Sequence, residues 1–315
     1  MTNSLPKISG WINFYKERGQ SSNKNLTEVK KIFYSMGYTR KMFKIGYLGT
    51  LDPFAEGILP IAIGEALKTI QFIPNEDKSY DFILKFGEET DTLDNTGKVT
   101  NTTDIIPSEK EVKDVLTNFL GEIEQIPPAF SALKINGERA YKLAREGKKF
   151  EIKKRKILIR ELRFLEKISD YEYKISVKCS KGTYVRTLGA DIAKSLNSLG
   201  HLTFLERTYN SGFDKKESIS LDNIKKMLQN EGESKNDADS MIKILDKIDS
   251  PLDGIPVLSI NENDKYLLET GRSIKRNNSL NDQNQIIRCH YNNHLVAICK
   301  LEQLELKPLR VFNIS

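Results

Sequence analysis

Residues 44–68 read KIGYLGTLDPFAEGILPIAIGEALK, and this stretch places a single carboxylate, Asp52, in a Gly-broken loop. An almost uninterrupted apolar run follows the loop. The run over residues 58–64 is short and rich in Ile, which predicts a buried strand. The pattern of residues 65–73 then predicts a short helix. Asp-Pro is by itself a common start of a turn, so Asp52 is either a turn former or a functional acid.

The composition is that of a globular chain. At 315 residues, with 38% of them hydrophobic, it can form one large domain or two unequal domains. Residues 1–19 lack a basic segment followed by an apolar one, and we expect neither export nor a membrane span. The three cysteines are an odd number, widely spaced and without a Cys-x-x-Cys pair, which favours a reducing compartment. We therefore expect a cytoplasmic protein.

Positive charge is concentrated in two segments. The net charge of +6 comes from 49 basic and 43 acidic residues. Residues 142–164 hold ten Lys and Arg against three Glu, and residues 16–44 hold eight against two. A single charge run is most often a solvated face, but two runs on either side of the Asp52 loop favour phosphate binding.

Helices and strands alternate irregularly in the sequence, which favours a mixed sheet with helices on it rather than a parallel barrel. Apolar residues at helical spacing predict a helix between Ser22 and Gly37, and Ser108 with Glu111 predicts a capping box for the next helix. The remaining elements are strands over residues 79–87, 156–165 and 171–180 and helices over residues 109–120 and 183–196.

The C-terminal region reads as a separate small module. Residues 229–241 are polar and acidic, which predicts a linker over about residues 229–250 and a domain boundary near Pro251. After it, two apolar strands flank Asn292-Asn293, a pair that tolerates the positive φ of a tight turn. We expect residues 251–315 to be all-β.

The sequence offers no good metal or cofactor site. Cys289, His290 and His294 are close together, but a turn at Asn292-Asn293 directs the two histidines to opposite faces. His201 stands alone, so a Ser-His-Asp triad has no candidate, and the phosphate-binding motif Gly-x-x-x-x-Gly-Lys is missing. We expect no metal and no cofactor.

Four motifs in order resemble the TruB family of tRNA pseudouridine synthases. They are residues 44–68, KSYDFILKFGEETDTLDNTG at 78–97, GEIEQIPPAFSALKINGERAYKLAREG at 121–147 and CSKGTYVRTLGADIA at 179–193. The resemblance covers about residues 7–210. Beyond the linker, LETGRSIKR at 268–276 is similar to the small PUA RNA-binding module that usually ends such proteins.

The resemblance implies a fold and a reaction. The fold is α+β: a pseudouridine-synthase-like catalytic domain over residues 1–250, with a central mixed β-sheet and flanking helices, and a PUA-like module over residues 251–315. The reaction is the isomerisation of uridine to pseudouridine in the T-arm of tRNA, at position 55. It breaks the C1′–N1 bond and forms C1′–C5, so it consumes nothing and needs no cofactor.

The resemblance also implies a catalytic site. Asp52 matches the catalytic carboxylate, which acts as a nucleophile or moves a proton. Arg186 matches the arginine that pairs with it, and Tyr80 matches a tyrosine that stacks on the target base. Tyr184 matches a tyrosine of the pocket. Two further matches are expected to contact the substrate: Leu205 at the pocket wall and Lys16 near the start of the domain.

RNA contacts follow from the resemblance together with the charge pattern. A flexible flap over residues 128–150 and the lysines beside it are expected to hold the backbone of tRNA. We expect the tRNA to bind through its T-arm stem-loop and the protein to be a monomer. These lysines are Lys148, Lys149, Lys153 and Lys154. Tyr47 is also expected to contact RNA, but it stands where the family usually has His, and Leu48 where it usually has Thr. The two departures leave a second hypothesis, an RNA-binding protein or tRNA-folding chaperone with weak or lost catalysis.

Overall fold

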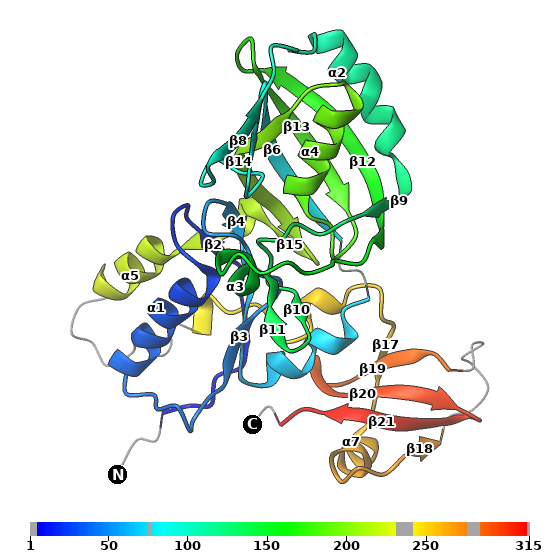
Figure 1. The fold of residues 1–315 in the computed structure, drawn as a ribbon. Coiled ribbons are helices and arrows are strands. Elements are labelled where there is room, and N and C mark those ends of the chain that lie inside the picture. Colours follow the sequence, from blue (N-terminus) through cyan, green and yellow to red (C-terminus); the bar gives the residue numbers. More distant parts are fainter. Residues whose placement is uncertain (1–4, 75–76, 231–241, 276–283, 314–315) are drawn as a thin grey trace.

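A nine-stranded sheet occupies the centre of the larger part of the molecule (Figure 1). The computed structural model describes residues 5–74, 77–230, 242–275 and 284–313. In spatial order the strands are β16 (Ile219–Ser220), β2 (Phe14–Lys16), β4 (Glu56–Ile58), β14 (Gly200–Asn210), β6 (Lys78–Phe86), β13 (Glu172–Cys179), β12 (Arg155–Lys167) and β9 (Gly121–Gln125), with β15 (Phe213–Asp214) paired to β14. The β14–β4 and β16–β2 pairs are parallel and the others antiparallel, which confirms the predicted mixed sheet.

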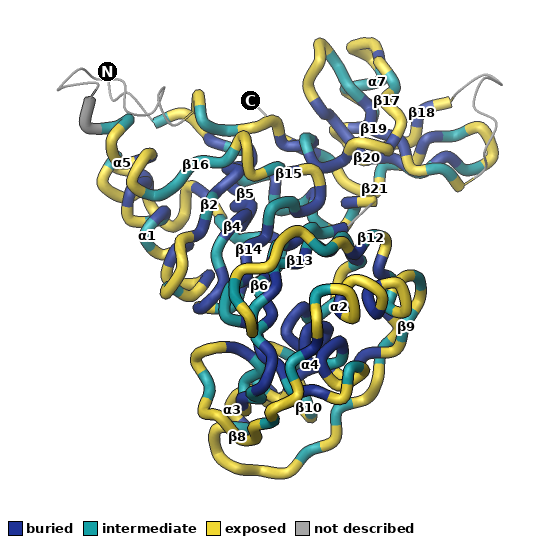
Figure 2. Tube along the Cα trace, turned by 90° about the horizontal axis from the view of Figure 1, so that it is seen from above, coloured by how far each residue is buried: buried dark blue, intermediate teal, exposed yellow. Residues whose placement is uncertain are grey.

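Helices α4 (Val185–Ser195) and α2 (Glu109–Leu116) pack on one face of this sheet, with α4 the more deeply buried of the two (Figure 2). The predicted capping box of α2 is confirmed, because the Ser108 hydroxyl accepts from the Glu111 amide and the Glu111 carboxylate accepts from the Ser108 amide. Strand β6 alternates along its length, and its buried side chains in this core are Tyr80, Phe82, Leu84 and Phe86.

The N-terminal segments form a second layer. Strands β1 (Gly10–Ile12), β5 (Ile61–Ile63) and β3 (Ile45–Tyr47) make a three-stranded sheet, and helices α1 (Ser22–Ser35) and α5 (Leu221–Asn230) lie beside each other. The predicted helix α1 is confirmed. It begins after Ser21, whose side chain accepts from the Lys24 amide, and it ends just before Gly37, which has a φ of +90°.

The apolar run after Asp52 differs from its prediction. The strand expected over residues 58–64 divides into β4 and β5, because Pro60 has no amide hydrogen to continue a ladder and the chain passes there from one sheet to the other. The helix expected over residues 65–73 consists of two 3₁₀ turns, Gly64–Lys68 and Ile70–Phe72.

Two small hairpins extend from the sheet. One pairs β7 (Glu88–Thr90) with β8 (Val99–Thr102), and the other pairs β10 (Lys134–Ile135) with β11 (Glu138–Arg139) and continues into helix α3 (Ala140–Arg145). The second hairpin and α3 make up most of the predicted flap, residues 128–150. Figure 2 shows β10 and α3 near α4, at the opposite end of the view from the C-terminal strands.

The C-terminal part is a five-stranded sheet with one helix. Its strands are β17 (Val257–Ser259), β19 (Ile286–Tyr291), β20 (His294–Glu302), β21 (Glu305–Val311) and β18 (Ile274–Lys275). The all-β prediction is wrong, because α7 (Glu262–Glu269) begins after Asn261, whose side chain accepts from the Asp264 amide. The predicted turn is confirmed, with φ of 48° at Asn292 and 63° at Asn293, and it sets His290 opposite Leu295 and His294 opposite Tyr291.

The C-terminal part has its own small core and also shares one with the rest of the chain. The shared interface cluster includes Trp11, Leu48, Ile58 and Phe213 from the first part and Ile248, Leu252, Ile298 and Phe312 from the second. The predicted linker over residues 229–250 needs correction, since Asp246 pairs with Trp11 through both backbone groups. Residues 231–241 of that linker lie outside the described residues. The segment after residue 241 therefore packs on the N-terminal part of the chain.

Leu252→Ala tests this shared core. Leu252 is fully buried in the interface cluster, and we expect the free energy of unfolding to fall by about 2–5 kcal/mol, the usual cost of removing a buried Leu side chain. Urea unfolding followed by the fluorescence of Trp11, the one tryptophan of the chain, measures it. Val257→Ala, at a half-exposed position of β17, is the control. Separate fluorescence and circular dichroism transitions would mean that the C-terminal part unfolds independently.

Candidate active site

Asp52 lies in the loop between β3 and β4. Ser22, at the start of α1, holds this loop because its hydroxyl donates to the Leu51 carbonyl and accepts from the Leu51 amide, both at 2.9 Å. The Asp52 carbonyl accepts from the Ala55 amide at 3.1 Å, so the residue does form a turn. Its side chain remains 37% exposed and points away from the loop. Asp52 can therefore be both a turn former and a functional acid.

Arg186, in the first turn of α4, is the partner of Asp52. One guanidinium nitrogen, Nη2, lies 2.9 Å from Asp52 Oδ2, and the other, Nη1, lies 3.3 Å from Asp94 Oδ2. The same two nitrogens donate to the carbonyls of Thr92, at 2.6 Å, and Phe130, at 2.9 Å. The arginine side chain is 4% exposed. This arrangement fixes the position of the Asp52 carboxylate and balances its charge.

Asp94 is a site residue that the sequence did not reveal. It is buried, and its Oδ1 accepts from the Thr92 hydroxyl, the Thr96 amide and the Thr96 hydroxyl. Its Oδ2 thereby remains directed at Arg186. Asp94 belongs to the motif at residues 78–97, but no local pattern connects it with a residue so far along the chain.

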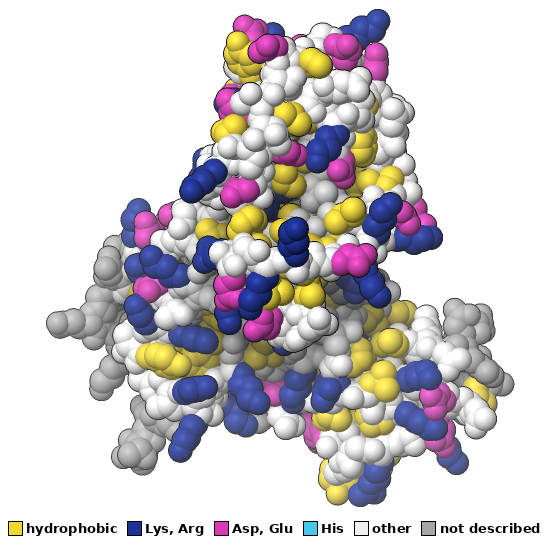
Figure 3. All heavy atoms as spheres, viewed as in Figure 1, with side chains coloured by type: hydrophobic (Ala, Val, Ile, Leu, Met, Phe, Trp, Pro, Cys, Tyr) yellow, Lys and Arg dark blue, Asp and Glu magenta, His cyan; other side chains and the backbone are white. Residues whose placement is uncertain are grey.

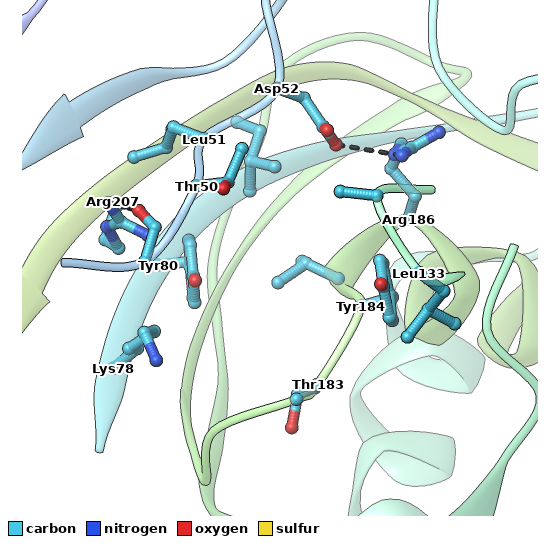
Figure 4. A pocket seen from close by; sticks show the side chains of 15 residues that line it. Thr50, Leu51, Asp52, Lys78, Tyr80, Leu133, Thr183, Tyr184, Arg186 and Arg207 are labelled. Atoms are coloured by element: carbon cyan, nitrogen blue, oxygen red, sulfur yellow. Dashed lines mark hydrogen bonds and ion pairs between the residues drawn. The ribbon is translucent and has the colours of Figure 1, made fainter. Parts of the chain in front are cut away.

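A cavity of about 300 Å³ opens beside the Asp52–Arg186 pair (Figure 4). Figure 4 shows Tyr80 and Tyr184 on opposite sides of the space below that pair. The structure thus brings together the five predicted residues Asp52, Tyr80, Tyr184, Arg186 and Leu205. Lys78, Thr183 and Arg207 also line the cavity and were not predicted.

Tyr80 forms part of the cavity wall from strand β6. Burial raises the pKa of its phenol to about 12, with a smaller opposing effect from Arg207. Arg207 lies across from it on β14 in the strand register, fully buried, and burial lowers the pKa of its guanidinium. Arg207 donates to the carbonyls of Ile58, at 2.6 Å, and Gly49, at 2.8 Å. It therefore connects the wall of the cavity with both ends of the Asp52 loop.

Tyr184 is held from both sides. The Gln125 side chain accepts from its amide at 2.8 Å and donates to its carbonyl at 3.1 Å. The guanidinium carbon of Arg155 lies 5.1 Å from the centre of its ring. Tyr184 is thus a fixed wall, placed immediately before α4.

A second cavity, of about 510 Å³, lies on the flap side of Asp52 and is lined by Tyr47, Phe130 and Tyr141 among others. The Tyr47 hydroxyl donates to Asn23 at 3.3 Å. Leu48, the other departure from the family pattern, is buried in the interface cluster and lines neither cavity. Of these two residues, only Tyr47 lines a cavity and is placed to contact RNA.

Lys16 requires a correction, because it cannot touch a substrate as predicted. It is fully buried, and its ammonium donates to the carbonyls of Ala55, at 2.5 Å, and Glu17, at 3.1 Å. Burial lowers the pKa of this lysine to about 8. Lys16 lies beneath the Asp52 loop and supports it.

The four predicted RNA-binding lysines are exposed around the flap and the start of β12. Lys148 lies 2.8 Å from Glu146, and Lys154 lies 3.4 Å from Glu124. Lys149 and Lys153 have no carboxylate within 4.0 Å in the part of the chain that the structure describes. Figure 3 shows Lys and Arg side chains across the middle and lower part of this face, with hydrophobic side chains between them.

His201 is buried, with Nδ1 3.0 Å from the Glu88 carbonyl oxygen. Over residues 5–74, 77–230, 242–275 and 284–313, no group of three His, Cys, Asp or Glu side chains is placed to hold a metal ion. No helix within those ranges has the length and apolar character needed to cross a membrane.

Comparison with known proteins agrees with this geometry. A family model described as TruB family pseudouridylate synthase (N terminal domain) matches residues 36–185. A protein of Rickettsia bellii named tRNA pseudouridine synthase B is 41% identical over 310 residues, which cover 98% of this chain and 99% of the relative. The chain belongs to the TruB family. A Caulobacter vibrioides protein of the same name is 35% identical over 316 residues, covering 98% of this chain and 97% of the relative.

Solved structures share the TruB family fold. A Cbf5-Nop10-Gar1 complex matches with a TM-score of 0.69 at 21% identity, covering 96% of this chain and 84% of that chain. An H/ACA RNP bound to a substrate RNA containing 2′-deoxyuridine matches with a TM-score of 0.70 at 18% identity, covering 96% and 85%. At these identities the likeness shows the fold alone. The predicted family, fold class and enzyme class, a pseudouridine synthase, are confirmed.

Asp94→Asn tests the second carboxylate on Arg186. The change keeps the size of the side chain but removes the charge, and we expect kcat to fall by about tenfold or more, because Arg186 is then fixed less firmly against Asp52. KM should change little. Steady-state pseudouridine formation measures both, with Asp104→Asn at an exposed position as the control. An unchanged kcat would mean that Asp94 only shapes its own turn.

Proposed function

We propose that the chain isomerises uridine to pseudouridine in the T-arm of tRNA, at position 55, with Asp52 as the catalytic carboxylate. One observation carries the proposal: Arg186 holds Asp52 at the edge of a cavity of about 300 Å³ that is walled by two tyrosines. The name of the relatives, tRNA pseudouridine synthase B, supports tRNA as the substrate. A cavity of this kind suits a base taken out of its RNA fold.

The residues have distinct roles in this proposal. Asp52 acts on the ribose, either by adding to C1′ or by moving a proton, as the C1′–N1 bond breaks. Arg186 keeps the carboxylate aimed at the sugar. Tyr80 stacks on the base, Tyr184 bounds it, and Leu205 supplies apolar contact while the base turns and presents C5 to C1′.

The surrounding parts bind RNA in this proposal. The flap over residues 128–150 covers the T-arm, the lysines beside it contact phosphates, and the PUA-like module over residues 251–315 adds affinity for the rest of the tRNA. The protein acts as a monomer in the cytoplasm, where tRNA is used. All three cysteines, Cys179, Cys289 and Cys299, are buried and none forms a disulfide, which fits a reducing compartment.

The competing hypothesis, an RNA-binding protein or tRNA-folding chaperone, rested on Tyr47 and Leu48. Leu48 lies in the core, which leaves Tyr47 as the one departure at a cavity. The Asp52–Arg186 pair is fully formed. These observations favour catalysis over binding alone.

Asp52→Asn separates the two hypotheses. The amide keeps the shape and the turn but not the charge, and we expect pseudouridine formation to be abolished while folding and RNA affinity stay near wild type. Chemical mapping of pseudouridine in a T-arm stem-loop and in whole tRNA measures the product, with Asp104→Asn as the matched control. Tight binding by the wild type without any product would favour the chaperone hypothesis, and full activity of Asp52→Asn would return this residue to a structural turn.

Lys149 and Lys153 test the RNA-binding surface. Because neither is paired with a carboxylate among the described residues, each is available to phosphate. Changing both to Ala should reduce the slope of log affinity against log salt by about 1.5, since each lost phosphate contact removes about 0.7–0.9. The control changes Lys110 and Lys167, which are exposed positions in α2 and at the end of β12. Equal slopes for wild type and variant would mean that Lys149 and Lys153 face only water.

A further inference from the structure

Two basic side chains of the cavity take no part in the chemistry described so far. Lys78 and Arg207 line it, and Figure 4 shows both on the side away from Arg186. They converge at Gly49, where an added Cβ would lie 3.3 Å from Lys78 Cε and 3.4 Å from Arg207 Nη1. Gly49 leaves this space free, with a φ of +73°. Two cations that meet beside a cavity favour negative charge at that end of it.

Arg207 has no ion-pair partner among the residues that the structure describes. It is 1% exposed, and it contacts the carbonyls of Ile58 and Gly49 and the hydroxyl of Tyr80. Within the described ranges no carboxylate lies within 4.0 Å of its guanidinium, and Asp52 acts on it only at longer range. Buried cations are normally paired with an anion. A negative charge inside the cavity would supply the missing partner.

The proposed reaction generates such a charge. When the C1′–N1 bond breaks, both bonding electrons stay on N1, so the detached base is the uracil anion, with its charge shared by N1, O2 and O4. This holds whether Asp52 adds to C1′ or takes a proton from the ribose. C5 then donates an electron pair to C1′, Asp52 is released or returns its proton, C5 loses a proton and N1 gains one. Atoms and charge balance.

We propose that Lys78 is a catalytic residue that donates to a carbonyl oxygen of the uracil anion, with Arg207 as a positioning residue behind Tyr80. The inference rests on the proposed function and deepens it. Lys78 and Tyr80 are two residues apart on β6 and therefore point to the same face. A base stacked on Tyr80 places its edge beside the ammonium. A donor fixed where charge develops, away from water, stabilises the transition state most.

Lys78→Met tests this role with two substrates. On uridine RNA at saturation we expect the single-turnover rate to fall about 100-fold, the usual effect of removing one donor to a developing anion. With 5-fluorouridine at the target position, fluorine itself stabilises the base anion, and we expect the loss to shrink to about tenfold. The readout in both cases is the disappearance of the parent nucleoside. Lys78→Arg should retain most of the rate.

The control is Lys85→Met, on the same strand but outside the cavity, where Lys85 pairs with Glu88 at 2.8 Å. Lys78→Gln is a second neutral variant, used in case the Met variant folds poorly by circular dichroism. Equal losses on the two substrates would overturn the proposal. The proposal would also be overturned if Lys78→Met kept its rate at saturation but bound RNA more weakly and with less salt dependence. That result would mean that Lys78 contacts a phosphate. If the wild-type protein makes no pseudouridine, the result contradicts the proposed function itself.

Discussion

The buried guanidinium of Arg186 is the constraint on which the site depends. It joins the Asp52 loop, the Thr92–Asp94 turn and the base of the flap at Phe130, three segments that lie far apart in the sequence. A charge removed from water needs close polar partners, so the segments that carry the four oxygen partners of Nη1 and Nη2 each have to stand in a fixed place. The flap is therefore tied to the same side chain that holds the carboxylate.

The sheet supplies the rigidity that this arrangement needs. The register of β6 against β14 sets Tyr80 opposite Arg207, and the close parallel pairing of β4 requires Gly57, since a Cβ there would lie 2.2 Å from the Arg207 carbonyl oxygen. Arg207 and Lys16 both donate to carbonyls in and around the Asp52 loop. Two buried cations beneath one loop explain how a partly exposed carboxylate keeps a single position.

Local signals in the sequence predicted much of the fold, because capping and turn chemistry act within a few residues. The capping box of α2 and the turn at Asn292-Asn293 were of this kind. Helix α7 was missed because eight residues carry too little periodicity, and the strand after Asp52 divides because of Pro60. Motif matching found Arg186, whereas Asp94 becomes a site residue only through a contact across the fold.

The most direct measurement is a crystal structure of the protein with a T-arm stem-loop that carries 5-fluorouridine at the target position. Because Arg186 holds Asp52 at the edge of the smaller cavity, we expect the target base inside that cavity, stacked on Tyr80. Ribose C1′ should then contact an Asp52 carboxylate oxygen. A base that stays in its RNA stack, or one that enters the larger cavity beside Tyr47 with its ribose away from Asp52, would contradict it.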